Sequence, residues 1–204
     1  MSIVVATLTA TFYKFYDLIR LCTKTIALRI PWSIKRGRVW LTPSMVPNSP
    51  NFDIQDSTFF TKWSQLPSPE EVRIQAEAQH LAGVNPDNRK VHSTTGPNVR
   101  PPPVIFKDRR LVVKWGSGVR VSEAQCLYAI RRFLQDQVPV PEVYGWRTDG
   151  DEKFIYMEYT EGKTLEQIWD LMEPDNRVSI CRELRTAYDN LRQLEQDLSD
   201  TFIG

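Results

Sequence analysis

Few residues of this 204-residue chain have the types and spacing that catalysis or metal binding requires. The three cysteines are scattered and form no CxxC pair, so we expect no metal site. The two histidines, His80 and His92, have no neighbouring aspartate and are interpreted as ordinary. Two charged residues remain: Lys114, which ends the run Val-Val-Lys, and Glu123, further along the chain. Alone neither is specific, because lysines often end strands and the helix dipole favours a glutamate in a first turn.

Two pairs of short β-rich runs should hold these charges in place. Residues 104–106 and 111–114 flank the charged turn Lys107-Asp108-Arg109-Arg110, which predicts a hairpin. A second hairpin is predicted for 143–146 and 154–157, with Asp149-Gly150 at its turn. Both predictions favour an antiparallel sheet.

Helices are expected between and after the hairpins. Ser122 is expected to cap a helix that contains EAQCLYAIRRFL. After Gly162, Thr164 and Gln167 form a capping box that should open a helix reaching Met172, and Pro174 begins a longer amphipathic helix. Because strands and helices are segregated along the chain, the predicted fold class is α+β.

The first 103 residues divide into three segments. Residues 1–40 carry seven basic residues and one acid, and they predict a basic amphipathic helical extension. This extension could pack on the domain, lie on a membrane surface, or act as an organelle-targeting segment. Residues 41–67 are a proline-rich linker or an irregular segment wrapped on the surface. Residues 68–103 hold a helix that begins at Ser68-Pro69-Glu70-Glu71, followed by a second proline-rich segment.

From about residue 100 to the end, the chain resembles fungal members of the aminoglycoside phosphotransferase family, which are relatives of choline kinases and protein kinases. The resemblance lies in the motifs VVKWG, SEAQ, VPVPEVYGW and FIYMEYTEGKTLEQIW. It implies a kinase-like small lobe with its hinge at 104–160, built from a twisted antiparallel sheet and one helix. Residues 161–204 would then be two helices at the start of a large lobe that is cut short.

The resemblance also implies a nucleotide site. Lys114 would contact the α- and β-phosphates of ATP, and Glu123 would hold the lysine in place. Backbone groups of Glu158 and Thr160 in the hinge would hydrogen-bond the adenine edge, and Met157 would lie beside the ring.

Two parts of the family pattern are missing from this sequence. No Gly-x-Gly-x-x-Gly precedes Lys114, and the nearest segment, 95–101, has one glycine. No His-Gly-Asp loop follows Lys114, so we name no catalytic residue and expect no magnesium unless a large lobe is supplied. We therefore expect weak ATP binding or none, and no phosphate transfer by this chain alone.

Two functions remain open at this point. The chain could be the nucleotide-binding portion of a phosphotransferase that acts on a small hydroxylated substrate. Alternatively, it could be a pseudokinase-like, non-catalytic binding or regulatory module whose open hinge face docks a protein partner. A net charge of +1 argues against nucleic acid as a partner. We expect a cytoplasmic location, with contact of 1–40 with a membrane surface as a lesser alternative.

Overall fold

The computed structural model describes residues 37–84 and 100–197. The chain forms two compact units. The sheet unit comprises Pro43–Tyr128 and Glu142–Tyr159, and the helical unit comprises the chain up to Thr42, Ala129–Pro141 and Thr160–Thr201. Most of the predicted extension at 1–40 lies outside the described residues. At its end, Val39–Leu41 forms strand β1 instead of continuing a helix.

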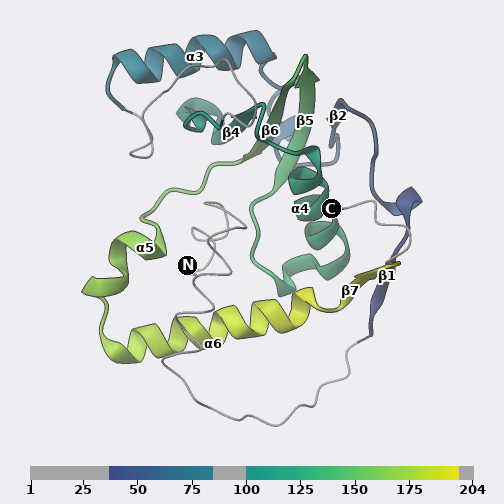
Figure 1. Ribbon diagram of the computed structural model, residues 1–204, viewed down its shortest axis with the longest axis vertical. Helices are drawn as coiled ribbons and strands as arrows, with labels where there is room; N and C mark the ends of the chain where they lie inside the picture. The colour runs from purple at the N-terminus through teal and green to yellow at the C-terminus, as the bar shows by residue number, and fades with distance from the viewer. Residues whose placement is uncertain (1–36, 85–99, 198–204) are drawn as a thin grey trace. The chain divides into compact units, whose positions relative to one another are not determined.

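The sheet unit is built on a five-stranded antiparallel sheet (Figure 1). The strand order is β2-β5-β6-β4-β3, and the strands are β2 (Phe52–Asp53), β3 (Val104–Phe106), β4 (Leu111–Gly116), β5 (Val143–Asp149) and β6 (Glu152–Glu158). Both expected hairpins are present, β3 with β4 and β5 with β6. The second turns at Gly150, whose φ of 56° suits a glycine. The α+β class predicted from the sequence is confirmed.

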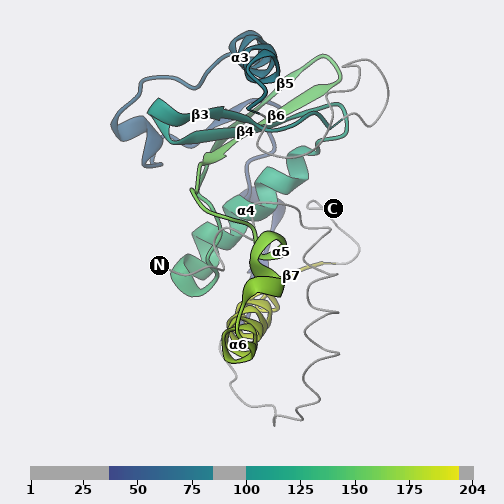
Figure 2. The same cartoon turned by 90° about the vertical axis from the view of Figure 1, so that its left-hand side faces the viewer.

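Helix α3 (Pro69–Leu81) covers one face of this sheet, and the first part of helix α4 (Val121–Leu134) lies on the other (Figure 2). The predicted capping box of α3 is present: Ser68 Oγ accepts from Glu71 N at 3.2 Å, and Ser68 N donates to Glu71 Oε2 at 2.6 Å. The core of the unit consists of Phe59, Leu66, Val72, Val104, Leu111, Val113, Trp115, Tyr144, Phe154 and Tyr156. From α3, Val72 belongs to this core and Ala76 packs against it.

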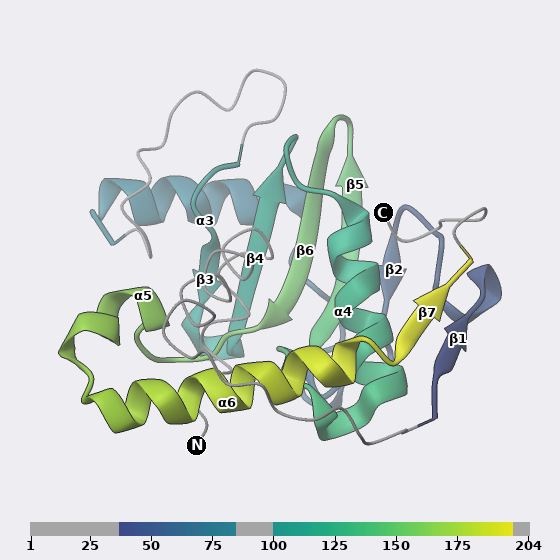
Figure 3. The same cartoon turned by 60° about the horizontal axis from the view of Figure 1, so that its bottom comes forward.

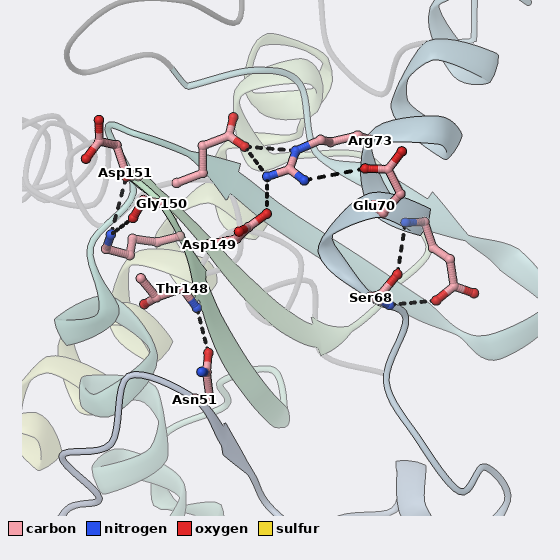
Figure 4. A network of polar contacts seen from close by, with 11 residues as sticks. Asn51, Ser68, Glu70, Arg73, Thr148, Asp149, Gly150 and Asp151 are labelled. Atoms are coloured by element: carbon pink, nitrogen blue, oxygen red, sulfur yellow. Dashed lines mark hydrogen bonds and ion pairs between the residues drawn. The ribbon is translucent and has the colours of Figure 1, made fainter.

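An arginine on α3 ties the helix to the β5–β6 turn. Figure 4 shows Arg73 reaching Asp149, with Nη2 at 2.6 Å from Oδ2. The same guanidinium contacts Glu152 Oε2 at 2.7 Å and lies 5.3 Å from the centre of the Phe154 ring. Arg73 therefore fixes the direction of α3 relative to the second hairpin.

Segment 41–67 is more than a linker. It supplies strand β2, which pairs with β5, and it supplies Phe59 and Leu66 to the core. The Trp146 indole donates to the Ser49 carbonyl at 2.8 Å, which holds the segment against the sheet. Of the two interpretations drawn from the prolines, the irregular surface-wrapping segment describes it better.

The start of α4 differs from the prediction. Ser122 lies inside the first turn and does not precede the helix, because α4 begins at Val121. The Arg120 carbonyl accepts the Glu123 amide at 3.0 Å, and the Val119 amide donates to Gly116 O at 3.2 Å. This tight turn directs the chain into the helix before Ser122 is reached.

The helical unit contains α5 (Leu165–Ile168), α6 (Pro174–Leu191) and a parallel pair of strands, β1 with β7 (Leu194–Gln196) (Figure 3). The capping box of Thr164 and Gln167 is present, as predicted. However, α5 ends at Ile168 and a short 3-10 helix, Trp169–Leu171, follows it. Met172 is extended, and so is Glu173, because proline disfavours helical backbone in the residue directly before it. Leu165, Ile180 and Leu184 form the core of this unit.

Two glutamines of α3 cover the outer edge of β3. Gln79 Oε1 accepts the Ile105 amide at 2.6 Å, and its Nε2 donates to Pro103 O at 3.3 Å. Gln75 Nε2 donates to the Ile105 carbonyl at 3.4 Å. A free sheet edge can pair with another strand, so these side chains satisfy backbone groups that would otherwise invite pairing.

We predict that Gln79→Ala lowers the free energy of unfolding by about 2 kcal/mol. Gln79 is buried, and its removal leaves the Ile105 amide without its acceptor. Urea unfolding followed by circular dichroism measures the change. Gln75→Ala is the matched control on the same helix and should cost less, because its bond is longer. Equal losses for both variants would contradict the role assigned to Gln79.

Candidate functional site

Lys114 lies on the sheet face opposite the core. In β4, Leu111, Val113 and Trp115 point into the core, so alternation places Lys114 on the other face. Its register partner on β6 is Ile155, and Val112 pairs with Met157 in the same way. Lys114 and Met157 therefore belong to the same face of the sheet.

The structure brings Lys114 and Glu123 together. The Lys114 ammonium donates to Glu123 Oε2, which joins strand β4 to the first turn of α4. Both side chains are 23% exposed, so the pair is partly shielded and still accessible from solvent. A strand and a helix hold the two charges, and a cation fixed in this way can bind an anion without first being ordered.

A short connection joins Gly116 at the end of β4 to the start of α4 at Val121. Gly116 has a φ of 117°, a conformation that side chains other than glycine rarely adopt. The turn that follows presents the Gly118 carbonyl, which accepts a hydrogen bond from Arg100 Nε at 2.7 Å. Arg100 is thereby placed beside the same helix start.

Arg100 also contacts Glu123, which no sequence motif indicated. Its Nη2 lies 3.6 Å from Glu123 Oε1, while Lys114 uses Oε2. The residue stands at the start of the run Arg-Pro-Pro-Pro, where the prolines predicted irregular chain and no function. Two cations from different segments, Arg100 before β3 and Lys114 on β4, thus share the Glu123 carboxylate.

The residues expected to form a hinge are placed less favourably for the expected adenine contacts. Met157 is buried, with 5% of its surface exposed. The Glu158 amide donates to Glu142 O at 2.8 Å, so this group is already used within the sheet unit. Thr160 Oγ1 is buried and has no hydrogen-bond partner among the described residues. Gly162 has a φ of 147°, a backbone conformation that favours glycine.

Three further features of residues 37–84 and 100–197 bear on metal binding, thiol chemistry and membrane insertion. No group of three or more His, Cys, Asp or Glu in these ranges is arranged to hold a metal ion. Burial raises the pKa of the Cys126 thiol to about 11, which keeps it protonated and unreactive at neutral pH. None of the helices described is both long and apolar enough to cross a membrane.

Comparison with protein-family models, with curated proteins and with solved structures found no significant match. The geometry of the sheet unit and its charged residues therefore carries the functional interpretation.

Proposed function

We propose that the sheet unit is the nucleotide-binding part of an ATP-dependent phosphotransferase of the aminoglycoside phosphotransferase type. The observation that carries the proposal is the contact of Lys114 with Glu123, made between a sheet strand and the helix that follows it. In kinase-like proteins such a lysine binds nucleotide phosphates and the glutamate holds it in position. Met157 lies on the same sheet face, on the side where the adenine would bind under this proposal.

The proposal concerns nucleotide binding first. Transfer to a small hydroxylated acceptor would need a catalytic aspartate and residues that hold magnesium. The sequence after Lys114 contains no histidine and hence no His-Gly-Asp loop. We therefore expect weak binding of ATP, without phosphate transfer by this chain alone.

Two features of the sheet unit differ from the nucleotide contacts that the family resemblance implies. The Glu158 amide is bonded to Glu142 O, so an adenine contact through that amide would have to replace a sheet hydrogen bond. The outer edge of β3 is covered by Gln79, at a point where a further strand could otherwise pair. Phosphate contacts would then depend on side chains more than on a glycine-rich loop.

We predict that Lys114→Met weakens ATP binding about 10-fold or more, because a hydrogen bond to a charged group contributes about 1.5–3 kcal/mol. Isothermal titration calorimetry with ATP measures the dissociation constant. Lys153→Met on β6 removes the same charge from the same sheet, and its ammonium donates to the Gly150 and Asp151 carbonyls at 3.4 and 3.3 Å. This control should bind ATP as the wild type does.

The outcome separates the two functions considered. A folded wild-type chain that shows no ATP binding would overturn the proposal and favour a non-catalytic binding module. ATP binding that is unchanged in Lys114→Met would also overturn it, since the nucleotide would then bind elsewhere.

A further inference from the structure

The Glu123 carboxylate is contacted by two cations, one on each oxygen. Lys114 reaches Oε2 from β4, and Arg100 reaches Oε1 at 3.6 Å from the segment before β3. Two positive charges and one negative charge leave this group with a net positive charge. Because the group is compact and lies at the surface of one sheet face, it can attract an anion.

The hydrogen-bonding capacity of the two cations exceeds what Glu123 uses. An ammonium has three donors and a guanidinium has five. Arg100 Nε donates to the Gly118 carbonyl at 2.7 Å, whereas the 3.6 Å contact of Nη2 with Glu123 is an ion pair too long for a hydrogen bond. A partly exposed ion pair of this kind contributes little to stability, so a ligand can take over Nη2 at small cost. The Arg100 side chain is 35% exposed and open to such a ligand.

Arg100 is held by the same strand that carries Lys114. The adjacent Pro101 and Pro102 are buried, and the Pro102 carbonyl accepts the Trp115 indole N–H at 3.1 Å. Trp115 follows Lys114 directly on β4. The two cations therefore have a common rigid support, which reduces the entropy that a ligand would lose in ordering them.

We propose that Arg100 is a second phosphate-binding residue beside Lys114, so that two side-chain cations bind the polyphosphate of a nucleotide. This inference rests on the proposed function and adds a residue to it. The sequence before Lys114 lacks the glycine-rich loop whose backbone would cover the phosphates, and Arg100 supplies donors in its place. The planar guanidinium matches two phosphate oxygens at once, which a lysine does not. Two cations favour ligands with more than one phosphate, so ATP should bind more tightly than AMP.

The test compares Arg100→Gln with Arg120→Gln in the full chain. Arg120 is exposed and directly precedes α4, so its replacement removes the same charge near the helix start. ATP, AMP and inorganic tripolyphosphate are titrated by calorimetry in about 150 mM salt, where the Debye length of about 8 Å suppresses general attraction. We expect Arg100→Gln to weaken the binding of ATP and of tripolyphosphate about 10-fold or more. The affinity for AMP should stay nearly unchanged. Arg120→Gln should bind all three as the wild type does.

Comparing the variants and ligands shows whether the role of Arg100 or the proposed nucleotide site is wrong. Weaker ATP binding in Lys114→Met but not in Arg100→Gln would overturn the role of Arg100 and leave the nucleotide site standing. Tripolyphosphate binding that depends on both cations, without ATP binding, would support the anion site and overturn the nucleotide function. Binding of neither ligand would overturn both, and equal losses in the two arginine variants would reduce Arg100 to a general charge effect.

Circular dichroism and thermal unfolding check that Arg100→Gln folds. Where it does not, Arg100→Lys takes its place, because it keeps the charge and lacks the guanidinium fork. Weaker ATP binding with AMP unchanged in that variant supports the inference, and unchanged ATP binding overturns it.

Discussion

Replacing Phe154 by alanine should lower the free energy of unfolding by about 3–5 kcal/mol. The ring is fully buried on β6, which lies between β5 and β4 in the sheet. It stacks on Trp115, with ring centres 5.9 Å apart and planes inclined by 15°, and Arg73 lies over it. Alanine would leave a cavity between the sheet and α3 that neighbouring aromatic side chains cannot fill without changing their rotamers.

Urea unfolding monitored by circular dichroism measures this loss, and Tyr156→Phe is its matched control. Tyr156 is fully buried two residues further along β6, within the same core. Its hydroxyl has no hydrogen-bond partner among the described residues, so removing it relieves a buried polar group. The control should change the free energy of unfolding by less than about 1 kcal/mol in either direction. A loss from Tyr156→Phe as large as that from Phe154→Ala would contradict this account of the core.

The Phe154 ring packs on the sheet face opposite the candidate site and holds the strand next to Lys114 in place. Residues on β6 alternate between faces, so Phe154 fills the core while Ile155, the next residue, is the register partner of Lys114. A shift of β6 in Phe154→Ala would therefore move the strand against which the lysine is placed. The site depends on packing on the far side of the sheet as well as on its own charges.

Elements with local chemical signals could be predicted from the sequence. Ser68 and Glu71 satisfy each other's backbone groups within four residues, so the start of α3 needs no distant partner. Asp149-Gly150 specifies its turn in the same local way, since glycine adopts the positive φ that the hairpin requires.

Elements held by distant contacts could not be predicted. Strand β2 is two residues long, too short for any alternation of apolar and polar residues to appear. Contacts from β5 hold it: Arg147 Nη2 lies 2.5 Å from Asp53 Oδ1, and the Thr148 amide donates to Asn51 Oδ1 at 2.9 Å. These partners lie more than 90 positions away in the sequence, and the nearby prolines indicate only irregular chain.

The candidate site could be predicted only in part, because one of its contacts is local in sequence and the other is not. Lys114 and Glu123 are close in sequence, on a strand and the helix after it, so their contact follows from one short connection. Arg100 reaches Glu123 from the segment that precedes β3, where Pro101 and Pro102 are buried and the Pro102 carbonyl accepts the Trp115 indole N–H. Proline patterns predict where regular structure stops, and they do not predict what an irregular segment packs against.

Gly145→Ala should lower the free energy of unfolding by about 3 kcal/mol, through a clash with backbone. Gly145 lies on β5 at a register irregularity and pairs with Asp53 of β2 and with Tyr156 of β6. A Cβ at this position would come within 3.0 Å of the Phe52 carbonyl oxygen and 2.9 Å from Leu66 Cδ1. The leucine methyl can rotate away, but the carbonyl oxygen can move only if β2 moves.

Hydrogen exchange of single amides shows which part of the sheet is destabilised, whereas the free energy of unfolding reports only the total loss. The Ile54 amide donates to Tyr144 O at 2.9 Å, next to Gly145, and should lose protection first in Gly145→Ala. Gly150→Ala is the control: a Cβ there meets open space, and the φ of 56° alone should cost about 1 kcal/mol. If both variants lost the same stability and Ile54 stayed protected, the close approach of Phe52 to β5 would not constrain the sheet. Segment 41–67 would then be dispensable for the stability of the sheet. The pairing of β2 with β5 would not be needed to hold the strands that carry the candidate site.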